Sequence, residues 1–283
     1  MELTMAGRLA GKVAFITGAA RGQGRNHAIR MAEQGADIIA VDICAEIDTV
    51  TPFYPLATSD ELEQTVKAVE ATGQRIVART ADVRDLDALQ QAFDEGVQEL
   101  GRIDIVLANA GIATYGKSWE LTSEMWKDMI DVNLTGVFHT AKVAIPTLIE
   151  QGEGGSMVFT SSIGGLKGIQ HVAHYVSAKH GIVGLMRTMS NELAPYNVRV
   201  NTIHPTNVAT IMVKNPGTYS MFVGEGEEAT EEAAAPGMVG LNSLAVPWVE
   251  CDDITNAILY LTSDDGRYVT GTTLTVDAGA FTK

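Results

Sequence analysis

Short apolar runs rich in β-branched residues alternate along the chain with longer stretches whose apolar residues recur at helical spacing. Such runs are typical of buried parallel strands, and the stretches between them of helices that cover a sheet. The alternation predicts an α/β fold with a doubly wound parallel sheet flanked by helices. The expected strands are 12–17, 37–41, 75–81, 103–108, 156–160, 198–203 and 273–276.

Helices are expected between these strands. One follows the first strand as far as Gln34, and another begins near Ser59, which we assign as its N-cap. A long helical stretch from Ser123 to Glu150 has Asn133 in its middle, and Pro146 is expected to bend or end it. The other expected helices are 85–100, one that carries Tyr175 and ends near Leu193, and 252–261.

The composition bounds the class of protein. A chain of 283 residues with 46% hydrophobic and 19% charged residues is ordinary for a globular protein with a sizeable core. The net charge of −15 argues against nucleic acid or an anionic membrane as a partner. Cys44 and Cys251 suggest no disulfide framework, and the first residues have no apolar run of a signal peptide. We therefore expect a cytoplasmic protein without a membrane span.

A glycine-rich loop joins the first strand to the first helix. Gly18, Gly22 and Gly24 follow Thr17 with the spacing TGxxxGxG. Glycine allows a tight turn and lets the backbone approach a pyrophosphate, while the next helix offers free N–H groups and the positive end of its dipole. The loop therefore predicts a dinucleotide site.

The second strand ends at Asp42, where a carboxylate can accept hydrogen bonds from ribose hydroxyls and repel a 2′-phosphate. Arg21 in the glycine-rich loop is the opposing feature, because a guanidinium can pair with that phosphate. We weigh Asp42 more heavily, since its charge sits directly at the ribose position. The predicted cofactor is NAD.

The segment 161–179, which reads SSIGGLKGIQHVAHYVSAK, is expected to contain active-site residues. Tyr175 and Lys179 are four residues apart, so on a helix they share one face. Tyrosine is a poor base at neutral pH, and a nearby positive charge favours its phenolate. Ser162 precedes Tyr175 by thirteen residues, across a glycine-containing loop that can fold its hydroxyl towards the ring.

Together these features resemble the short-chain dehydrogenase/reductase family, from about Gly7 to Asp277. The resemblance rests on the glycine-rich loop, the strand end Asn109-Ala110-Gly111, Asn133 in the long helix and the YxxxK pair. It implies a single Rossmann-type domain over residues 1–283 with the strand order 3-2-1-4-5-6-7. It further implies reversible hydride transfer between NAD(H) and an alcohol or ketone, and a homotetramer.

The resemblance also assigns roles to residues. Tyr175 is the general acid/base, Lys179 stabilises its phenolate and holds the nicotinamide ribose, and Ser162 orients the substrate oxygen. Asn133 kinks its helix and holds a water beside Lys179; an Asn satisfied by neighbouring backbone is the alternative. The residues implied for the cofactor are Gly18, Arg21, Gly22, Gln23, Gly24, Asp42, Ile43, Asp82, Val83, Asn109, Ala110, Gly111, Tyr175, Lys179, Pro205, Val208 and Thr210.

Three features depart from the usual family pattern. Ala108 stands where Asn is common, and Thr206 replaces a glycine after Pro205. The segment 43–58, with Phe53 and its neighbours Pro52, Tyr54 and Pro55, is an insertion. It is either a surface loop or an aromatic cover that holds the adenosine side of the cofactor. We favour the cover, because the insertion resembles the subgroup of carveol dehydrogenases and mycofactocin-linked dehydrogenases, in which the cofactor does not exchange freely and a redox partner reoxidises it.

The segment 211–248 is rich in Met, Phe, Tyr and Gly and is expected to form a substrate lid. An apolar lid implies a small lipophilic alcohol or ketone, and the subgroup points to a cyclic terpenoid such as carveol. The expected pocket residues are His171, His174 and Met212. No metal site is expected, because the two histidines lack a third ligand and the glutamates at 225, 227, 228, 231 and 232 are interpreted as a solvated stretch. The apolar side chains expected to form this substrate lid are Met212, Tyr219, Met221, Phe222, Met238 and Trp248.

Two alternatives stay open. A freely exchanging NAD(P)-dependent reductase of another carbonyl compound, such as a steroid or an acyl thioester, has the same fold. A non-catalytic nucleotide-binding protein also keeps the fold, but it has no physical need for Asn133, Ser162, Tyr175 and Lys179 together.

Overall fold

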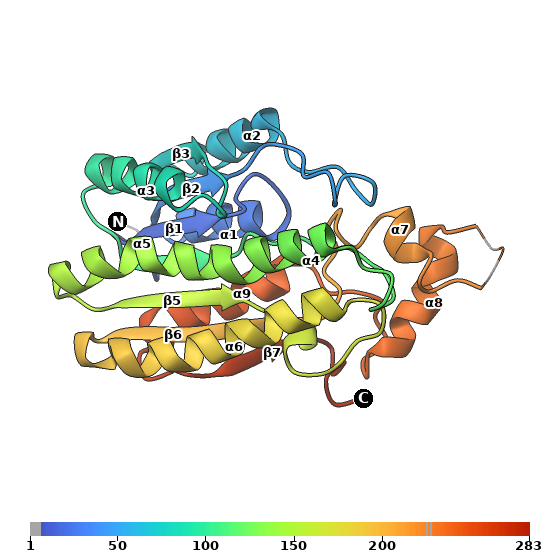
Figure 1. The fold of residues 1–283 in the computed structure, drawn as a ribbon. Coiled ribbons are helices and arrows are strands. Elements are labelled where there is room, and N and C mark those ends of the chain that lie inside the picture. The colour runs from blue at the N-terminus through green and yellow to red at the C-terminus, as the bar shows by residue number, and fades with distance from the viewer. Residues whose placement is uncertain (1–6, 225, 227) are drawn as a thin grey trace, which may run out of the picture.

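The computed structural model describes residues 7–224, 226 and 228–283. Parallel strands form a seven-stranded sheet in the order β3-β2-β1-β4-β5-β6-β7, which confirms the predicted fold class and strand order. Helices cover both faces of this sheet (Figure 1). The strands are β1 Val13–Thr17, β2 Asp37–Asp42, β3 Ile76–Thr80, β4 Ile105–Ala108, β5 Gly155–Thr160, β6 Val198–Pro205 and β7 Thr273–Val276.

The helices form two layers. Helices α1, α2 and α9 lie on one face of the sheet, and α3, α4, α5 and α6 lie on the other (Figure 1). Their bounds are α1 Gly22–Glu33, α2 Ser59–Glu70, α3 Leu86–Leu100, α4 Ser123–Ile130, α5 Gly136–Gln151, α6 Ala173–Leu193, α7 Pro216–Tyr219, α8 Glu231–Leu241 and α9 Cys251–Thr262. The described residues also include one π-helical turn, η1 Asp131–Thr135, and three 3₁₀ turns, η2 Ile163–Gly165, η3 Ala194–Tyr196 and η4 Asp264–Gly266.

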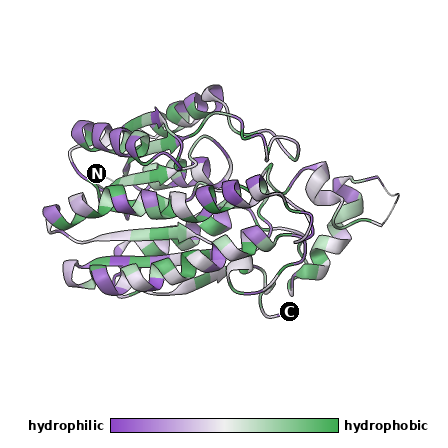
Figure 2. Cartoon of the chain, in the orientation of Figure 1, coloured by the Kyte–Doolittle hydropathy of each residue, from purple (hydrophilic) through white to green (hydrophobic). Residues whose placement is uncertain are grey.

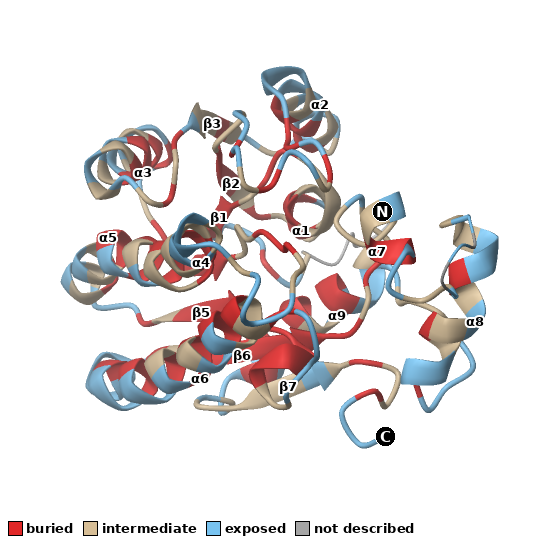
Figure 3. Ribbon diagram, turned by 45° about the vertical axis from the view of Figure 1, so that its right-hand side comes forward, coloured by how far each residue is buried: buried red, intermediate tan, exposed pale blue. Residues whose placement is uncertain are grey.

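Side-chain alternation along the strands explains the two layers. Successive strand residues point to opposite faces, and in β1 Val13 and Phe15 join the core with α3, α5 and α6, while Ala14 and Ile16 join the core with α1 and α9. Strands β1, β2 and β4 in the middle of the sheet are therefore mostly apolar (Figure 2) and buried on both faces (Figure 3), whereas the edge strands β3 and β7 are only partly buried. This burial is what makes a wholly parallel sheet stable.

One local prediction is wrong. The N-cap of α2 is Thr58 rather than Ser59, because Glu61 lies three residues after Thr58 and the two residues form a reciprocal capping box. The expected helical stretch from Ser123 to Glu150 is present as α4, η1 and α5 without a break, and the π-helical turn η1, which is one residue wider than an α-helical turn, lies at Asn133. Pro146 lies inside α5 and does not end it.

The carboxyl ends of the strands mark the functional end of the molecule. In Figure 1 the segment 43–58, α7 and α8 all gather at that end. Open parallel sheets bind ligands at this edge.

Candidate active site

Two connected cavities lie at the carboxyl ends of the strands. The first, here called the glycine-loop cavity, extends from the loop after β1 to the ends of β2, β3 and β4. The second, here called the Tyr175 cavity, lies at the ends of β4, β5 and β6. The residues that line both cavities are Gln23, Asn109, Gly111, Ile112, Thr210 and Met212.

The residues predicted to contact a dinucleotide come together around these cavities. Those that line the glycine-loop cavity are Gly18, Arg21, Gly22, Gln23, Gly24, Asp42, Ile43, Asp82, Val83, Asn109, Ala110, Gly111 and Thr210. Those that line the Tyr175 cavity include Tyr175, Lys179, Pro205, Val208 and Thr210.

The start of α1 is built to hold an anionic group. Gly18 has a φ of +69°, and a Cβ there would lie 2.8 Å from the Cα of Ala110, so only glycine fits. The N-cap of α1, Arg21, is extended, and its side chain caps no helical N–H group. The side-chain oxygen of Gln23 is buried with no hydrogen-bond partner in the described part of the chain. Free N–H groups at a helix start suit a pyrophosphate, whereas the Gln23 oxygen can only accept and therefore suits a hydrogen-bond donor of the ligand.

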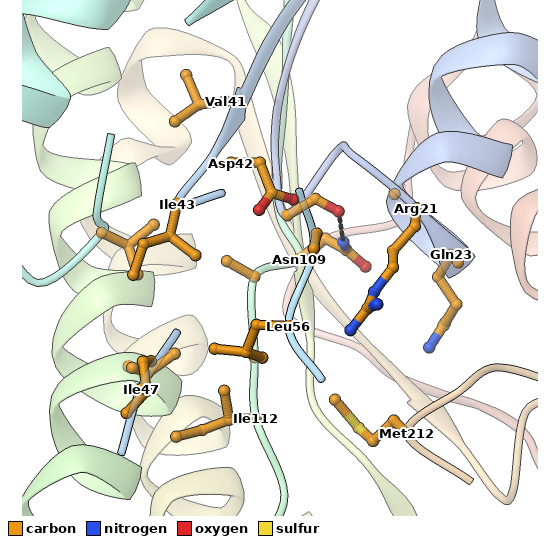
Figure 4. Close-up of a pocket in the computed structure, with 18 of the residues that line it drawn as sticks. Arg21, Gln23, Val41, Asp42, Ile43, Ile47, Leu56, Asn109, Ile112 and Met212 are labelled. Atoms are coloured by element: carbon orange, nitrogen blue, oxygen red, sulfur yellow. Dashed lines mark hydrogen bonds between the residues drawn. The ribbon is translucent and has the colours of Figure 1, made fainter. Parts of the chain in front are cut away.

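Asp42 lies at the end of β2 on the wall of the glycine-loop cavity (Figure 4). Its carboxylate accepts hydrogen bonds from the backbone amides of Ala20 at 2.9 Å and Cys44 at 3.3 Å. Burial raises the pKa of Asp42, and these hydrogen bonds counteract the rise. The backbone therefore fixes a carboxylate where ribose hydroxyls are expected.

Arg21 is bonded to the insertion. Its guanidinium donates to the carbonyl oxygen of Pro55, and its Nη1 lies 3.7 Å from Oε2 of Glu61. The side chain is only 21% exposed, so this arrangement is part of the folded surface rather than a solvated arginine. The guanidinium of Arg21, which the sequence analysis considered as a partner for a 2′-phosphate, therefore binds protein groups.

The insertion 43–58 belongs to the core of the molecule. Ile47 and Tyr54 are buried in the same apolar cluster as Phe15 of β1. The Tyr54 hydroxyl accepts a hydrogen bond from the backbone amide of Ala113 at 2.9 Å. The insertion residues that line the glycine-loop cavity are Ile43, Ile47, Tyr54, Leu56 and Ala57. The sequence analysis had named Ile43 as a cofactor residue and Tyr54 as part of the aromatic cover, but not Ile47 or Leu56 (Figure 4).

Ser162, Tyr175 and Lys179 meet at the Tyr175 cavity. The side chain of Ser162 lies close enough to the Tyr175 hydroxyl to lower its pKa. Lys179 Nζ lies 5.4 Å from the centroid of the Tyr175 ring and donates to the carbonyl oxygen of Thr160 at 2.8 Å. As predicted, Tyr175 and Lys179 lie on one face of α6. Ser162 lies in the loop after β5, which brings it to the same cavity.

Burial dominates the electrostatics of this cluster. It raises the pKa of Tyr175 to about 12, while the side chain of Ser162 acts in the opposite direction. It lowers the pKa of Lys179 to about 7. Both shifts have the same physical cause, since a medium of low polarity disfavours the charged form of each group. In the protein alone, Tyr175 is therefore a neutral hydroxyl with a proton to give.

Asn133 lies in the π-helical turn η1 and is fully buried. Its side-chain oxygen accepts from the amide of Ile112 at 3.0 Å, and its Nδ2 donates to the carbonyl of the same residue at 2.8 Å. The amide is thus satisfied by neighbouring backbone, and it anchors the chain directly after β4. The water that the resemblance places beside Lys179 stays a prediction.

The three predicted pocket residues have different positions. His171 and Met212 line the Tyr175 cavity. His174 is fully buried, its Nε2 lies 2.8 Å from Oγ1 of Thr114, and it does not line the cavity. Consecutive helix residues point about 100° apart, and in α6 His174 faces Thr114 in the interior while Tyr175 faces the cavity.

The segment 211–248 has a small core of its own. Tyr219, Ala234 and Met238 form its centre, with Phe222 and Trp248 packed around them. Of the apolar side chains predicted to form the substrate lid, only Met212, Met221 and Phe222 line the Tyr175 cavity. Leu241 of α8 lines it as well.

Polar contacts tie this segment to the rest of the protein. The Tyr115 hydroxyl, which the sequence analysis did not single out, lies 2.9 Å from Oγ1 of Thr218 in α7. Thr206, which stands in place of a glycine, donates to Oδ1 of Asn242 at the end of α8. Thr206 therefore has a structural role at this position.

The glutamate run is not uniformly solvated. Glu231 accepts a hydrogen bond from Tyr219 and pairs with Lys214 at 3.4 Å. Glu228 is exposed, whereas Glu225 and Glu227 lie outside the described residues. In the part of the chain that the structure describes, no three His, Cys, Asp or Glu side chains are grouped to hold a metal ion. No helix within those same residues is long and apolar enough to span a membrane.

Comparison with known proteins agrees with this geometry. The family model for short chain dehydrogenases matches residues 12–218. The chain belongs to the short-chain dehydrogenase/reductase family. It is 52% identical to (-)-trans-carveol dehydrogenase from Rhodococcus erythropolis over 277 residues, which cover 98% of this chain and 99% of that protein.

Two solved structures are also similar. Carveol dehydrogenase from Mycobacterium avium in complex with NAD is 50% identical, with a TM-score of 0.96, and the match covers 98% of this chain and all of that one. A short chain dehydrogenase from Mycobacterium paratuberculosis bound to NAD is 41% identical, with a TM-score of 0.89 and the same coverage. The predicted family is confirmed, and the similarity to carveol dehydrogenases is consistent with the predicted subgroup.

Proposed function

We propose that the protein transfers a hydride between NAD(H) and a lipophilic secondary alcohol or ketone, and that a cyclic terpenoid alcohol such as carveol is its substrate. The observation that carries this proposal is the meeting of Ser162, Tyr175 and Lys179 at the Tyr175 cavity, directly beside the glycine-loop cavity. The identity to (-)-trans-carveol dehydrogenase supports the substrate class.

Tyr175 is the proposed general acid/base. Bound NAD(H) accepts or supplies the hydride at its nicotinamide ring. In the reducing direction neutral Tyr175 donates its proton to the carbonyl oxygen, and in the oxidising direction its phenolate takes the alcohol proton. Ser162 holds the substrate oxygen, and Lys179 stabilises the negative charge on Tyr175. Proton transfer of this kind contributes about 10² to 10⁴ in rate.

The walls of the glycine-loop cavity support NAD over NADP. The Asp42 carboxylate is positioned to accept from ribose hydroxyls, and a phosphate at that place would meet like charge. Arg21 offers no free guanidinium, because it is bonded to Pro55 and lies beside Glu61. Both NAD-bound relatives fit this preference.

The walls of the Tyr175 cavity support an uncharged substrate. Among its described lining residues, the only Lys, Arg, Asp or Glu is Lys179, which belongs to the proposed machinery. The other lining side chains include Ile163, Ile169, Val213, Met221 and Phe222. A carboxylate or phosphate would find no second cation there, which favours a terpenoid alcohol over an acyl thioester with a phosphate-bearing carrier.

The insertion 43–58 supports a cofactor that is held rather than exchanged. Its residues Ile47, Tyr54 and Leu56 cover the glycine-loop cavity, and Phe53 packs edge-on against Tyr115 with ring centroids 5.8 Å apart. On this proposal a separate redox partner reoxidises the bound cofactor. The segment 211–248 acts as the substrate lid of a single-domain subunit, and we expect a cytoplasmic homotetramer.

The experiment is to add carveol to purified protein and to follow reduced-nicotinamide absorbance with and without excess NAD. We expect absorbance to rise by one equivalent per subunit and then to stop, and oxidation of carveol to continue only when an artificial electron acceptor reoxidises the bound cofactor. Continuous turnover with added NAD would refute the held cofactor but keep the dehydrogenase. If neither carveol nor other cyclic alcohols reduce the cofactor, but a hydroxyacyl thioester or a steroid alcohol does, the proposed substrate class is wrong.

A further inference from the structure

His204 lies near the end of β6, directly behind Ser162. Its Nδ1 is 2.7 Å from the backbone carbonyl oxygen of Ser162, and its Nε2 is 2.8 Å from Oγ1 of Thr202. The side chain is fully buried and does not line the Tyr175 cavity. His204 therefore touches the loop that carries the Ser162 hydroxyl but not the space in which a substrate would sit.

The hydrogen-bond partners decide which ring nitrogen carries the proton. A carbonyl oxygen can only accept, so Nδ1 of His204 must be the donor to Ser162. Burial lowers the pKa of His204 to about 4, which keeps the ring neutral near pH 7. In a neutral ring with its proton on Nδ1, Nε2 accepts from the Thr202 hydroxyl at 2.8 Å, a shorter contact than the one from that hydroxyl to the carbonyl oxygen of Thr272 at 3.3 Å.

The Ser162 backbone is held by two donors. Its carbonyl oxygen accepts from Nδ1 of His204 and from the amide of Gly165 at 2.9 Å. Its hydroxyl oxygen accepts from the amide of Gly164 at 3.0 Å. The Gly164 and Gly165 contacts lie within the same short turn, so they can move with Ser162 as a unit. His204 is the side chain that ties Ser162 to the rigid sheet.

We propose that His204 is a positioning residue, which fixes the Ser162 backbone so that the serine hydroxyl points at the substrate oxygen. The inference rests on the proposed function, since it acts only through the role given to Ser162. Misplacement of a reacting or orienting group by about 1 Å can cost about 10² in rate. Replacement of His204 should therefore lower kcat by about tenfold to a hundredfold, with little change in NAD binding.

The test is a double-mutant cycle with the full-length protein. His204→Leu removes both hydrogen bonds, whereas His204→Asn keeps an amide donor at the place of Nδ1. Each is made with Ser162 intact and in a Ser162→Ala background, and kcat, KM and NAD binding by fluorescence are measured with carveol. Thr202→Val removes the hydroxyl that bonds Nε2 and leaves the ring and its bond to Ser162 in place. Circular dichroism and thermal unfolding identify any variant that fails to fold.

We expect kcat to fall for His204→Leu, to recover at least in part for His204→Asn, and to fall less for Thr202→Val. In the Ser162→Ala background, His204→Leu should cause almost no further loss, because residues that act as a unit are non-additive. Equal losses in both backgrounds would overturn the inference and assign His204 a purely structural role. Wild-type activity of Ser162→Ala alone would instead overturn the proposed role of Ser162.

Discussion

The hydroxyl of Tyr54 accepts a hydrogen bond from the backbone amide of Ala113 at 2.9 Å, so the insertion 43–58 is joined to the chain just after β4. The next amide towards the strand, that of Ile112, is held by Asn133. Two buried side chains from distant segments thus satisfy consecutive backbone donors beside both cavities. The insertion is part of the framework that positions the active site.

Removal of that hydroxyl should destabilise the protein. Tyr54→Phe leaves the buried amide of Ala113 without its acceptor, and we expect a loss of about 1–3 kcal/mol in the free energy of unfolding. Chemical denaturation measures this loss. Tyr196→Phe is the matched control, because Tyr196 is 44% exposed, and it should change the free energy by less than about 0.5 kcal/mol. Equal effects of the two substitutions would contradict the structural role of Tyr54.

Loss of the Tyr175 hydroxyl should remove turnover and spare the cofactor site. Tyr175→Phe keeps the ring under Lys179 Nζ but has no proton to give, so we expect kcat to fall by about 10² to 10⁴. NAD binding, measured by fluorescence or calorimetry, should stay close to that of the unsubstituted protein. Turnover at the unsubstituted rate would exclude Tyr175 from the mechanism.

Tyr115 links the insertion to the proposed lid, because its ring packs on Phe53 and its hydroxyl meets Thr218 of α7. Tyr115→Leu removes both contacts and should speed NAD release about tenfold. Tyr115→Phe keeps the ring contact and should have a smaller effect. Release is followed by a chase of bound NAD with excess unlabelled cofactor. Release rates unchanged in both variants would show that the insertion does not hold the cofactor through this contact.

Acid should weaken the fold through His27. This residue of α1 is fully buried against Thr255 of α9, and burial lowers its pKa to about 3. Because the unfolded chain binds a proton near pH 6.5 and the folded one does not, stability falls as pH drops below 6.5. The contribution of His27 between pH 7 and pH 5 is about 2 kcal/mol.

Unfolding in denaturant at both pH values tests this prediction. His27→Asn carries no titratable ring, so the loss of stability between pH 7 and pH 5 should shrink by about that amount. His180→Asn, at an exposed position of α6, should keep the pH dependence of the unsubstituted protein. A His27→Asn variant that loses as much stability as the parent would contradict the assignment.

Local motifs explain why so much could be predicted from the sequence. The glycine-rich loop, Asp42 at a strand end and the Tyr175–Lys179 spacing each act over a few residues, and the parallel sheet brings their strand ends to one edge. The order of the strands follows from the same family pattern. The function of such residues can be predicted from their type and their spacing in the sequence.

Long-range contacts explain most of what the sequence did not reveal. Tyr54 and Tyr115 acquire their roles from partners far along the chain, at Ala113 and Thr218, and no local spacing announces such pairs. His174 has the same residue type as His171 but falls on the buried side of α6. The N-cap of α2 was the exception, since Thr58 and Glu61 form a recognisable sequence pattern.

The engagement of Arg21 has a consequence for protein engineering. A redesign for NADP would begin at Asp42, but its removal alone supplies no cation for the extra phosphate. Arg21 could supply that cation only by leaving Pro55 and Glu61, and that would break the contacts that join the start of α1 to the insertion 43–58 and to α2. Coenzyme preference and the packing of the insertion are therefore a single design problem in this protein, and a new cation would have to be introduced elsewhere along the end of β2.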